Sequence, residues 1–352
     1  MHAKTIAIDL AKNVFEVAVA DERGRVEKRR RLSRGQLVRF LATHPPAQVV
    51  MEACGSGHHW ARVAVRHGHK VGLLPMQYVR PYRRRNKTDR ADTNAILEAA
   101  RAPDITPVAV KTPDQQALQG LHRVRAQWMR TRQARINLMR GLLRELGVVM
   151  PQGARTALSR IHELVEDAEV DIPSAMRTML FEVLGEVRGL EQRIAELERE
   201  LKRHAGSGSD ASHLMQVPGV GLLTATAMVA AVPDPALFRS ARHFASWLGL
   251  TPRESSSGQR RLLGRISKRG NTYLRTLLIH GARAVLNRAK QVARLHRQPL
   301  NRLQRWVLTL DARNGHNRAV VALANRLARI IWAVWHHRRP FQADWSPAAL
   351  TF

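Results

Sequence analysis

The stretch TIAIDLAKNVFEVAVADERGRVEKRRRL, residues 5–32, decides how the N-terminal part of the chain folds. Thr5–Leu10 and Asn13–Ala20 are rich in β-branched and apolar residues, as strands are. The turn residues of Asp21–Gly24 follow, and Arg25–Leu32 can return as a third strand whose basic side chains indicate a solvent-facing or edge position. The stretch therefore predicts an antiparallel meander of three strands.

Helices and strands alternate beyond the meander. Arg34–His44 has helical spacing and ends before two prolines. The next elements are expected as a strand, a helix, a strand and a helix at Ala47–Ala53, His58–Gly68, Lys70–Pro75 and Thr88–Arg101. The order βββ-α-β-α-β-α is that of a ribonuclease H-like sheet, although many α/β domains share parts of it. We therefore expect an α/β N-terminal domain of this class.

The middle of the chain is predicted to be helical. Pro113–Gly147 reads as one long helix whose arginines we expect to follow a phosphate backbone. Beyond it, apolar residues recur in four-three alternation at Met176, Leu180, Val183, Val187, Leu190, Ile194, Leu197 and Leu201. This heptad seam predicts a coiled coil, formed either between subunits or with the helix around Thr156–Glu166. His204–Ser212 reads as a linker.

These features divide the chain into three expected domains. Residues 1–150 would form the catalytic α/β domain with its long basic helix, and residues 151–205 the coiled-coil region. Residues 206–352 would form a mostly α-helical domain. Its Val217–Gly221 stretch, VPGVG, resembles the turn of a helix-hairpin-helix element, in which backbone N–H groups bind a DNA phosphate. Gly219 and Gly221 are the residues expected at that contact.

The composition favours a polyanionic partner. The 352 residues contain 58 Lys and Arg against 28 Asp and Glu, which gives a formal net charge of +30. Arginine dominates the basic residues, and its planar guanidinium suits phosphate. A genome rich in GC would also raise the arginine content. The basic residues recur along the whole chain, which argues against a single disordered arm.

Four carboxylates are expected to meet at one edge of the predicted sheet. Asp9 ends the first strand and Glu52 the fourth, and these strands are neighbours in a ribonuclease H-like sheet. Asp89 and Asp92 stand three positions apart, on one face of the helix that follows. Carboxylate ligands favour Mg²⁺ or Mn²⁺ over zinc, and two such ions can promote phosphoryl transfer. A salt-bridged surface helix is the simpler alternative.

The residues just before this helix are strongly basic. We expect them to hold a nucleic acid beside the metal site, and they comprise Arg83, Arg84, Arg85 and Lys87. In the C-terminal part, a Ser/Gly loop leads into a second basic stretch. There, the residues expected to hold the scissile strand are Arg260, Arg261, Arg265, Lys268 and Arg269.

Several blocks together carry a family resemblance. They are IAIDLAKNVFEVAV, VVMEACGSGHHWA, NKTDRADTNAILEAA, VPGVGLLTATA and GLTPRESSSGQRRLLGRISKRGNTYLR. In order and spacing they resemble the DEDD transposases of bacterial insertion-sequence family 110, its 1111 subgroup and the related Piv-type invertases. The resemblance spans nearly the whole chain. It implies a RuvC-like domain, a coiled coil and a C-terminal transposase domain.

The resemblance also implies a mechanism. The four acidic residues of the family fall on Asp9, Glu52, Asp89 and Asp92, and its serine nucleophile falls on Ser257, with Ser255 and Ser256 left open. The serine would attack a DNA phosphodiester and form a covalent phosphoserine link. Family members are guided by a structured non-coding RNA, the bridge RNA, and assemble as multimers on two DNAs. We therefore expect donor and target DNA, guide RNA, Mg²⁺ and a homo-oligomer, a dimer or a tetramer, with the active site completed within one subunit or between two.

Two other function classes are compatible with parts of the sequence. A hydrolytic RuvC-like endonuclease would need the acidic residues but no serine, and a nucleic-acid-packaging protein would use only the charge. The single cysteine, Cys54, excludes an intramolecular disulfide and a thiolate zinc cluster. There is no signal-peptide pattern and no apolar run of the roughly 20 residues that a membrane span needs. We expect a cytosolic, nucleoid-associated protein.

Overall fold

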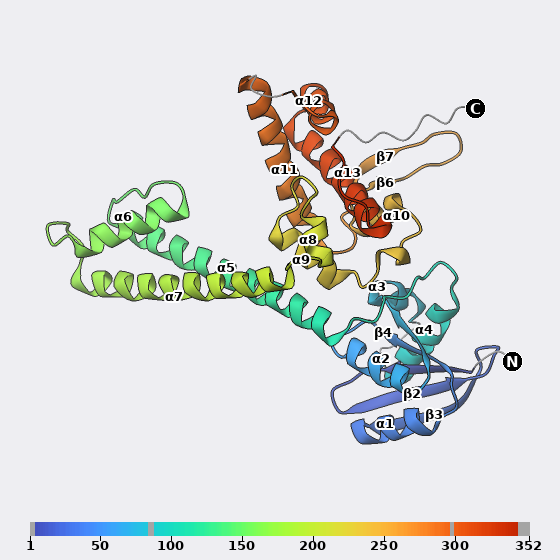
Figure 1. Cartoon of the computed structure of the whole chain (residues 1–352). Helices are drawn as coiled ribbons and strands as arrows, with labels where there is room; N and C mark the ends of the chain where they lie inside the picture. Colours follow the sequence, from blue (N-terminus) through green and yellow to red (C-terminus); the bar gives the residue numbers. More distant parts are fainter. Residues whose placement is uncertain (1–3, 84–87, 296–298, 344–352) are drawn as a thin grey trace, which may run out of the picture. The chain divides into compact units, whose positions relative to one another are not determined.

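The computed structural model describes residues 4–83, 88–295 and 299–343. The chain folds into two compact units, Met1–Pro113 and Asp114–Phe352 (Figure 1). Each has its own hydrophobic core, and each is described separately below.

The first unit contains a five-stranded sheet. Its strands are β1 (Thr5–Asp9), β2 (Val14–Ala20), β3 (Val26–Ser33), β4 (Gln48–Glu52) and β5 (Lys70–Leu74). They lie in the order β3-β2-β1-β4-β5, with β1, β2 and β3 antiparallel and β1, β4 and β5 parallel. The predicted meander and the two later strands are confirmed.

Helices cover both faces of this sheet. They are α1 (Arg34–Thr43), α2 (Gly57–Arg66), α3 (Met76–Val79), a short 3-10 helix η1 (Arg80–Tyr82) and α4 (Asp89–Arg101). Ile8 and Phe15 pack with Leu37 and Trp60 of α1 and α2 on one face. Because successive strand residues point to opposite faces, Ala7 lies on the other face, where α4 packs. The sequence did not predict α3 and η1, which are too short to show a period.

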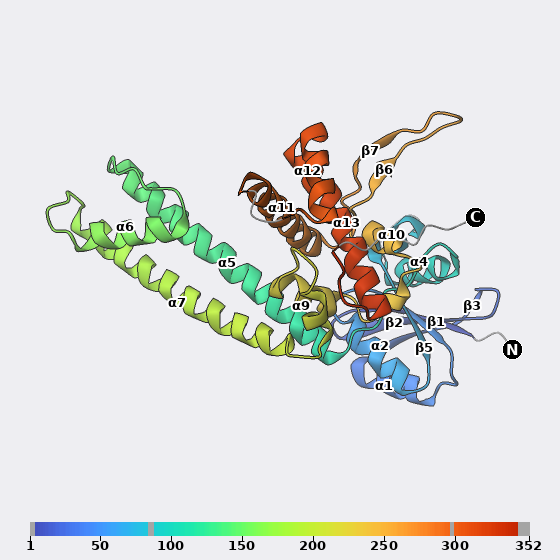
Figure 2. The same ribbon diagram turned by 45° about the horizontal axis from the view of Figure 1, so that its top comes forward.

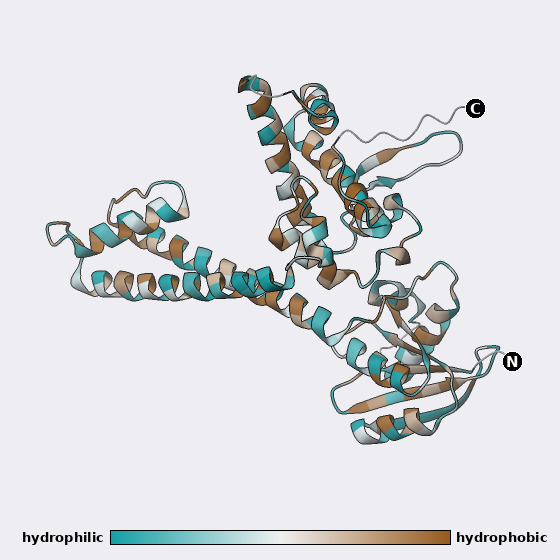
Figure 3. Cartoon of the chain, in the orientation of Figure 1, coloured by the Kyte–Doolittle hydropathy of each residue, from teal (hydrophilic) through white to brown (hydrophobic). Residues whose placement is uncertain are grey.

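The second unit begins with three helices that form an arm. They are α5 (Pro113–Glu145), α6 (Ala154–Glu166) and α7 (Ser174–His204). Apolar residues of all three helices share one core, and Figure 3 shows hydrophobic and hydrophilic residues alternating along α5 and α7. The helix with the heptad seam is confirmed, and most of its predicted apolar positions are buried, with Leu184 buried in place of Val183.

Ion pairs join α7 to α5 in antiparallel orientation. Arg125 contacts Glu198 at 2.6 Å, and further along α5 two more arginines contact glutamates that lie progressively earlier in α7, in the pairs Arg132–Glu191 and Arg135–Glu186. The helical partner of α7 therefore includes α5, which the sequence did not indicate. These three guanidinium groups bind carboxylates of the same chain, and the prediction that the α5 arginines follow a phosphate backbone stays a prediction.

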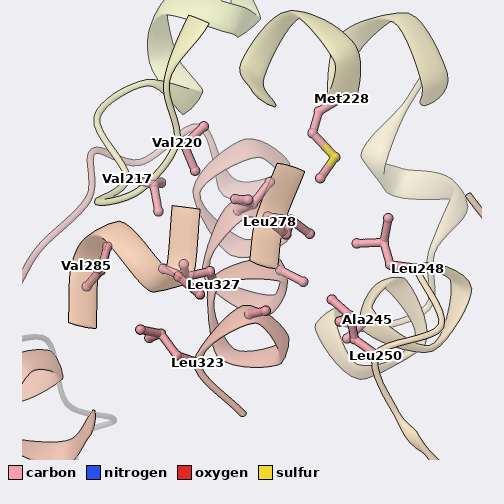
Figure 4. Packing of buried hydrophobic residues seen from close by; sticks show 14 of the residues in the cluster. Val217, Val220, Met228, Ala245, Leu248, Leu250, Leu278, Val285, Leu323 and Leu327 are labelled. Atoms are coloured by element: carbon pink, nitrogen blue, oxygen red, sulfur yellow. The ribbon is translucent and has the colours of Figure 1, made fainter. Parts of the chain in front are cut away.

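The remaining elements of the second unit form a helical bundle with one hairpin. They are α8 (Asp210–Leu214), α9 (Leu222–Ala231), a 3-10 helix η2 (Pro235–Leu237), α10 (Ala241–Trp247), β6 (Pro252–Glu254), β7 (Leu263–Ile266), α11 (Thr272–Leu295), α12 (Arg302–Asn314) and α13 (His316–His337). Figure 4 shows the core of this bundle, where Met228 of α9 and Leu248 lie close to Leu278 of α11 and Leu327 of α13.

The two units differ from the three expected domains. His204–Ser212, expected as a boundary, lies within the second unit, and its second half contains the start of α8. Leu197 and Leu201 of α7 share a cluster with Ala230 of α9, so the arm and the bundle are packed together. Within the part of the chain that the structure describes, no helix is long and apolar enough to cross a membrane.

Candidate active site

Two of the predicted carboxylates stand at neighbouring strand ends. β1 and β4 are parallel, and their register pairs Ile8 with Met51. Asp9 and Glu52 are the next residues and the last of their strands, so both lie at the carboxyl edge of the sheet. Both are partly buried. This is the arrangement expected from the sequence.

The alternation of the strands places both carboxylates on the face covered by α4. Asp9 follows Ala7 by two positions and Glu52 follows Val50 by two, and both of these apolar residues pack with α4. A third carboxylate, Glu16, is paired directly opposite Asp9 on β2. Glu16 was not among the predicted site residues, although it is a charged residue inside the otherwise apolar strand VFEVAVA. Like charges placed opposite each other are destabilising unless cations compensate them.

Helix α4 brings the other two predicted carboxylates in its first turn. The Thr88 hydroxyl caps the helix by accepting the N–H of Ala91. Asp89 is exposed, whereas the side chain of Asp92 is only 12% exposed. Acidic residues in this position also stabilise the positive end of a helix, so part of the simpler interpretation is correct as well.

Arginines bind the carboxylates of this face. Arg83 Nε lies 2.6 Å from Asp92 Oδ1, and Arg31 Nη2 lies 3.1 Å from Asp89 Oδ2. Arg31 also reaches Glu16, at 3.8 Å, so it links β2 to α4. The acidic group is therefore interleaved with cations from β3 and from the segment after η1. Of the basic residues predicted before α4, Arg83 is engaged in this way, and Arg84, Arg85 and Lys87 lie outside the described residues.

The donor chemistry of this face suits a hard divalent cation. All four predicted ligands are carboxylates, which Mg²⁺ and Mn²⁺ prefer. Asp92 Oδ1 is buried and accepts no hydrogen bond, although Arg83 lies against it. In residues 4–83, 88–295 and 299–343, no three His, Cys, Asp or Glu side chains gather closely enough to hold a metal ion. The four residues thus suit Mg²⁺ in being carboxylates and in lying on one face of the sheet. The metal site itself stays a prediction.

The predicted serine lies at the tip of the hairpin formed by β6, β7 and the loop between them, named here the serine hairpin (Pro252–Ile266). Figures 1 and 2 both show it extending away from α11 and α13. Ser257 and Arg260 exchange two backbone hydrogen bonds, at 3.2 and 3.1 Å. Gly258 between them has a φ of +56°, the left-handed conformation that a two-residue hairpin turn uses. The two-residue turn closed by Ser257 and Arg260 therefore places Ser257 at the exposed tip of the hairpin.

The three adjacent serines differ in their surroundings. The Ser256 hydroxyl donates to Glu254 Oε1 at 2.9 Å and accepts the N–H of Leu262 at 3.3 Å. The hydrogen bond from Ser256, and then those from Arg261, hold the pKa of Glu254 below its ordinary value. All three serines are exposed, and Ser256 is the one held by these side-chain hydrogen bonds. Ser256 is thus a structural brace, which favours one of its neighbours as the reactive hydroxyl.

Basic side chains follow this serine along the hairpin and at its base. All five predicted phosphate contacts are exposed, namely Arg260, Arg261, Arg265, Lys268 and Arg269. Arg261 Nε is 3.0 Å from Glu254 Oε1, so its charge is partly compensated. The hairpin therefore presents a hydroxyl next to Arg260 and carries further cations toward its base, as a site for a phosphodiester would.

The predicted helix-hairpin-helix turn has a packing role. Gly219 has a φ of +79°, and a Cβ there would lie 2.7 Å from the carbonyl oxygen of Gly281 on α11. Val217 and Val220 on either side are buried. Gly219 is therefore required for close contact with α11, whereas Gly221 has open space around it.

Known families match segments in both units of the chain. A family described as "Transposase", of the DEDD type, matches residues 6–148, and "Transposase IS116/IS110/IS902 family" matches residues 211–298. The chain is 43% identical over 335 residues to "Probable family 20 transposase" of Pseudomonas aeruginosa, which covers 95% of this chain and 97% of that protein. The chain belongs to the IS110/IS116/IS902 family of transposases. It is therefore a DNA transposase or recombinase.

Two further relatives fit this family. "Transposase for insertion sequence element IS1111A" of Coxiella burnetii is 39% identical over 94% of this chain and 89% of its own length. The "Pilin gene-inverting protein" of Moraxella bovis is 24% identical over 96% of this chain and 97% of its own length. In this IS110-family chain, the four predicted carboxylates lie within the first matched region and the serine hairpin within the second.

Proposed function

We propose that this transposase cuts and exchanges DNA strands through a covalent phosphoserine intermediate, guided by a structured RNA. The acidic face would hold two Mg²⁺ ions through Asp9, Glu52, Asp89 and Asp92. Ser257 would be the nucleophile. The observation that carries the proposal is the placement of Asp9, Glu52 and the first turn of α4 on one face of a sheet with the order β3-β2-β1-β4-β5.

The strand order supports a ribonuclease H-like, RuvC-like assignment for the first unit. Three antiparallel strands followed by two strands parallel to the first are what that fold requires. In such a sheet, chemistry is carried by acidic residues at the central strand ends, and these are the ends of β1 and β4. Eight of the phosphate contacts proposed for this chain lie within its described residues: Arg83, Gly219, Gly221, Arg260, Arg261, Arg265, Lys268 and Arg269.

The serine step is balanced without an additional reactant. The oxygen of Ser257 forms a bond to phosphorus, the bond from phosphorus to one sugar oxygen breaks, and the hydroxyl proton ends on that sugar oxygen. The phosphoserine keeps the energy of the broken diester. A sugar hydroxyl of another strand then attacks the same phosphorus and returns a proton to the serine. Exchange of strands, and not net hydrolysis, is the outcome.

Residues of this chain would prepare that step. When bound, the two ions would polarise the phosphoryl oxygens and lower the pKa of the attacking hydroxyl. Arg260 and Arg265 would hold the scissile phosphate on the hairpin, and charge-assisted hydrogen bonds of this kind are strong. Turn closure between Ser257 and Arg260 keeps the hydroxyl beside a cation.

The partners follow from charge and family. A net charge of +30 suits donor DNA, target DNA and a guide RNA at once. We further propose that the protein acts in the nucleoid as a dimer or tetramer. The arm of α5 and α7 would serve as its coiled-coil region, and residues 1–150, 151–205 and 206–352 as its functional segments.

A strand-exchange assay tests this proposal. The purified protein is incubated with Mg²⁺, RNA transcribed from the ends of its element, and matching donor and target DNAs. Exchange should be lost in Ser257→Ala and in Asp9→Asn, but kept in Ser256→Ala, the matched control next to the nucleophile. A hydrolytic endonuclease predicts that Ser257→Ala cuts DNA as well as the unchanged protein. Exchange at equal rate without RNA would refute the guided part alone.

A further inference from the structure

The serine hairpin has few contacts of its own to fix its direction. Residues of β6 are all exposed, and in β7 Ile266 alone is partly buried, next to the bundle core. Among the described residues, the backbone hydrogen bonds of the tip lie within the hairpin itself, between Ser257 and Arg260 and between Ser255 and Leu262. The orientation of Ser257 is therefore set at the base of the hairpin, where the chain leaves α10 and returns to α11.

The two chain segments at this base lie in very close contact. Lys268 donates its N–H to the Gly249 carbonyl at 3.1 Å, and Ser267 donates to Thr251 at 2.8 Å. A Cβ on Gly249 would lie 2.0 Å from the Arg269 oxygen, and one on Gly270 would lie 1.9 Å from the Trp247 oxygen. Both glycines have positive φ, so no other residue fits this crossing without displacing it.

One buried guanidinium lies at this crossing. Arg275, on the first turn of α11, is 7% exposed. Its Nη1 donates to the carbonyl oxygens of Leu248 and Arg269, each at 3.0 Å, and its Nη2 donates to the Thr272 hydroxyl at 3.2 Å. Leu248 is on the outgoing segment and Arg269 on the returning one. Arg275 thus joins both sides of the hairpin base to the helix.

The buried guanidinium of Arg275 has neutral hydrogen-bond partners. In the part of the chain that the structure describes, no carboxylate lies within ion-pair distance of Arg275, and its hydrogen bonds go to two carbonyl groups and one hydroxyl. A buried charge without an ion-pair partner is costly, so a neutral side chain would serve better if packing were its only task. Nη1 alone donates to both carbonyl groups, and the planar guanidinium holds it and Nη2 in fixed directions, whereas a lysine ammonium is a flexible point charge.

We propose that Arg275 is the positioning residue of the serine hairpin. Its guanidinium fixes the angle at which the hairpin leaves the bundle, and thereby the direction in which Ser257 is presented to DNA. The reference to DNA rests on the proposed function, whereas the fixed angle is a property of the second unit by itself.

Spin-label distances test the positioning directly. Labels are placed at Gln259→Cys on the hairpin and Asn287→Cys on α11, in a Cys54→Ser background that removes the single native thiol. The expected result is a narrow distance distribution in the parent, a distribution at least twice as wide in Arg275→Met, and an intermediate width in Arg275→Lys. Arg283→Met, an exposed arginine on the same helix, is the matched control and should stay narrow.

Adduct formation supplies the functional half of the test. Arg275→Met should form the DNA–protein adduct at least tenfold more slowly, with DNA affinity within twofold of the parent and partial recovery in Arg275→Lys. Equal distance widths in the parent and both variants would overturn the proposal. If Arg275→Met fails to fold by circular dichroism, the Lys variant decides alone. If the parent protein forms no adduct, the proposed serine chemistry is wrong. The widths of the spin-label distance distributions still test the positioning role of Arg275.

Discussion

Arg83 Nε lies 2.6 Å from Asp92 Oδ1, and both side chains are mostly buried. Arg83 directly follows η1, and Asp92 lies in the first turn of α4. This ion pair places an arginine where the account expects a divalent cation to bind a carboxylate. The arginine and the cation should therefore compete for Asp92.

Arg83→Gln should make the protein more dependent on divalent ions. Without metal, Asp92 loses its cation inside a largely buried site, and the free energy of unfolding should fall by about 1–3 kcal/mol. With Mn²⁺, the gain in thermal midpoint should exceed that of the unchanged protein. Thermal melting in EDTA and in Mn²⁺ measures both. Arg25→Gln, which removes an exposed arginine paired with Asp21 in the turn between β2 and β3, is the control and should change little. Equal Mn²⁺ gains in Arg83→Gln and the unchanged protein would exclude competition at Asp92.

His122 should make the second unit sensitive to acid. It lies between α9 and α11, where Tyr273 Oη is 3.1 Å from its Nδ1 and Thr226 Oγ1 is 3.0 Å from its Nε2. Thr226 donates its own hydrogen to the Leu222 carbonyl, so His122 carries its proton on Nε2 and accepts from Tyr273. Burial, and then the charge of Arg125, lower the pKa of His122 to about 4.

The sign of this effect follows from linkage. Between pH 6.5 and 4 the unfolded chain binds the His122 proton and the folded chain does not, so stability falls as the pH falls through this window. Above pH 6.5 the group contributes no pH dependence. His122→Gln, which can keep both hydrogen bonds, should reduce the loss of stability between pH 7 and pH 5. Urea unfolding at the two pH values measures it. An unchanged difference would show that His122 titrates normally in the folded protein. Burial also lowers the pKa of His58, in the first unit, to about 4. The same measurement on a His58 variant therefore gives a comparison for the first unit.

Gly281→Ala should destabilise the second unit. Its Cβ would lie 2.1 Å from the Gly219 carbonyl oxygen, so the turn before α9 must move away from α11. We expect a loss of about 2–4 kcal/mol, comparable to other overpacked or opened cores. Gly185→Ala on α7 has open space and should stabilise the same unit by about 0.5–1 kcal/mol. Denaturant unfolding that shows equal stability for Gly281→Ala and the parent would contradict this packing role.

The sequence predicted local elements well and long-range partners less well. β1 to β5 and α4 follow from apolar runs, turns and caps, each readable within about ten residues. The carboxylates Asp9 and Glu52 could be placed at strand ends because parallel neighbours share an edge. Glu16 was missed because its pairing with Asp9 depends on register, which strand patterns do not give.

The arm shows where sequence patterns mislead. An arginine such as Arg132 on α5 has the same appearance whether it faces phosphate or a glutamate on another helix. Only the antiparallel packing of α5 on α7 brings Glu191 to it. The ties of Arg275 to Leu248 and Arg269 join residues up to 27 positions apart, and no local pattern shows them.

Mapping the covalent link tests the central claim most directly. The complex with DNA is trapped in Mg²⁺, digested with nuclease and trypsin, and the peptide Glu254–Arg260 is fragmented in a mass spectrometer, since Arg253 and Arg260 bound it. The account predicts a nucleotide mass on Ser257 in the unchanged protein and none in Asp9→Asn or in EDTA. Strand exchange by the unchanged protein with no nucleotide on any serine of that peptide would contradict it.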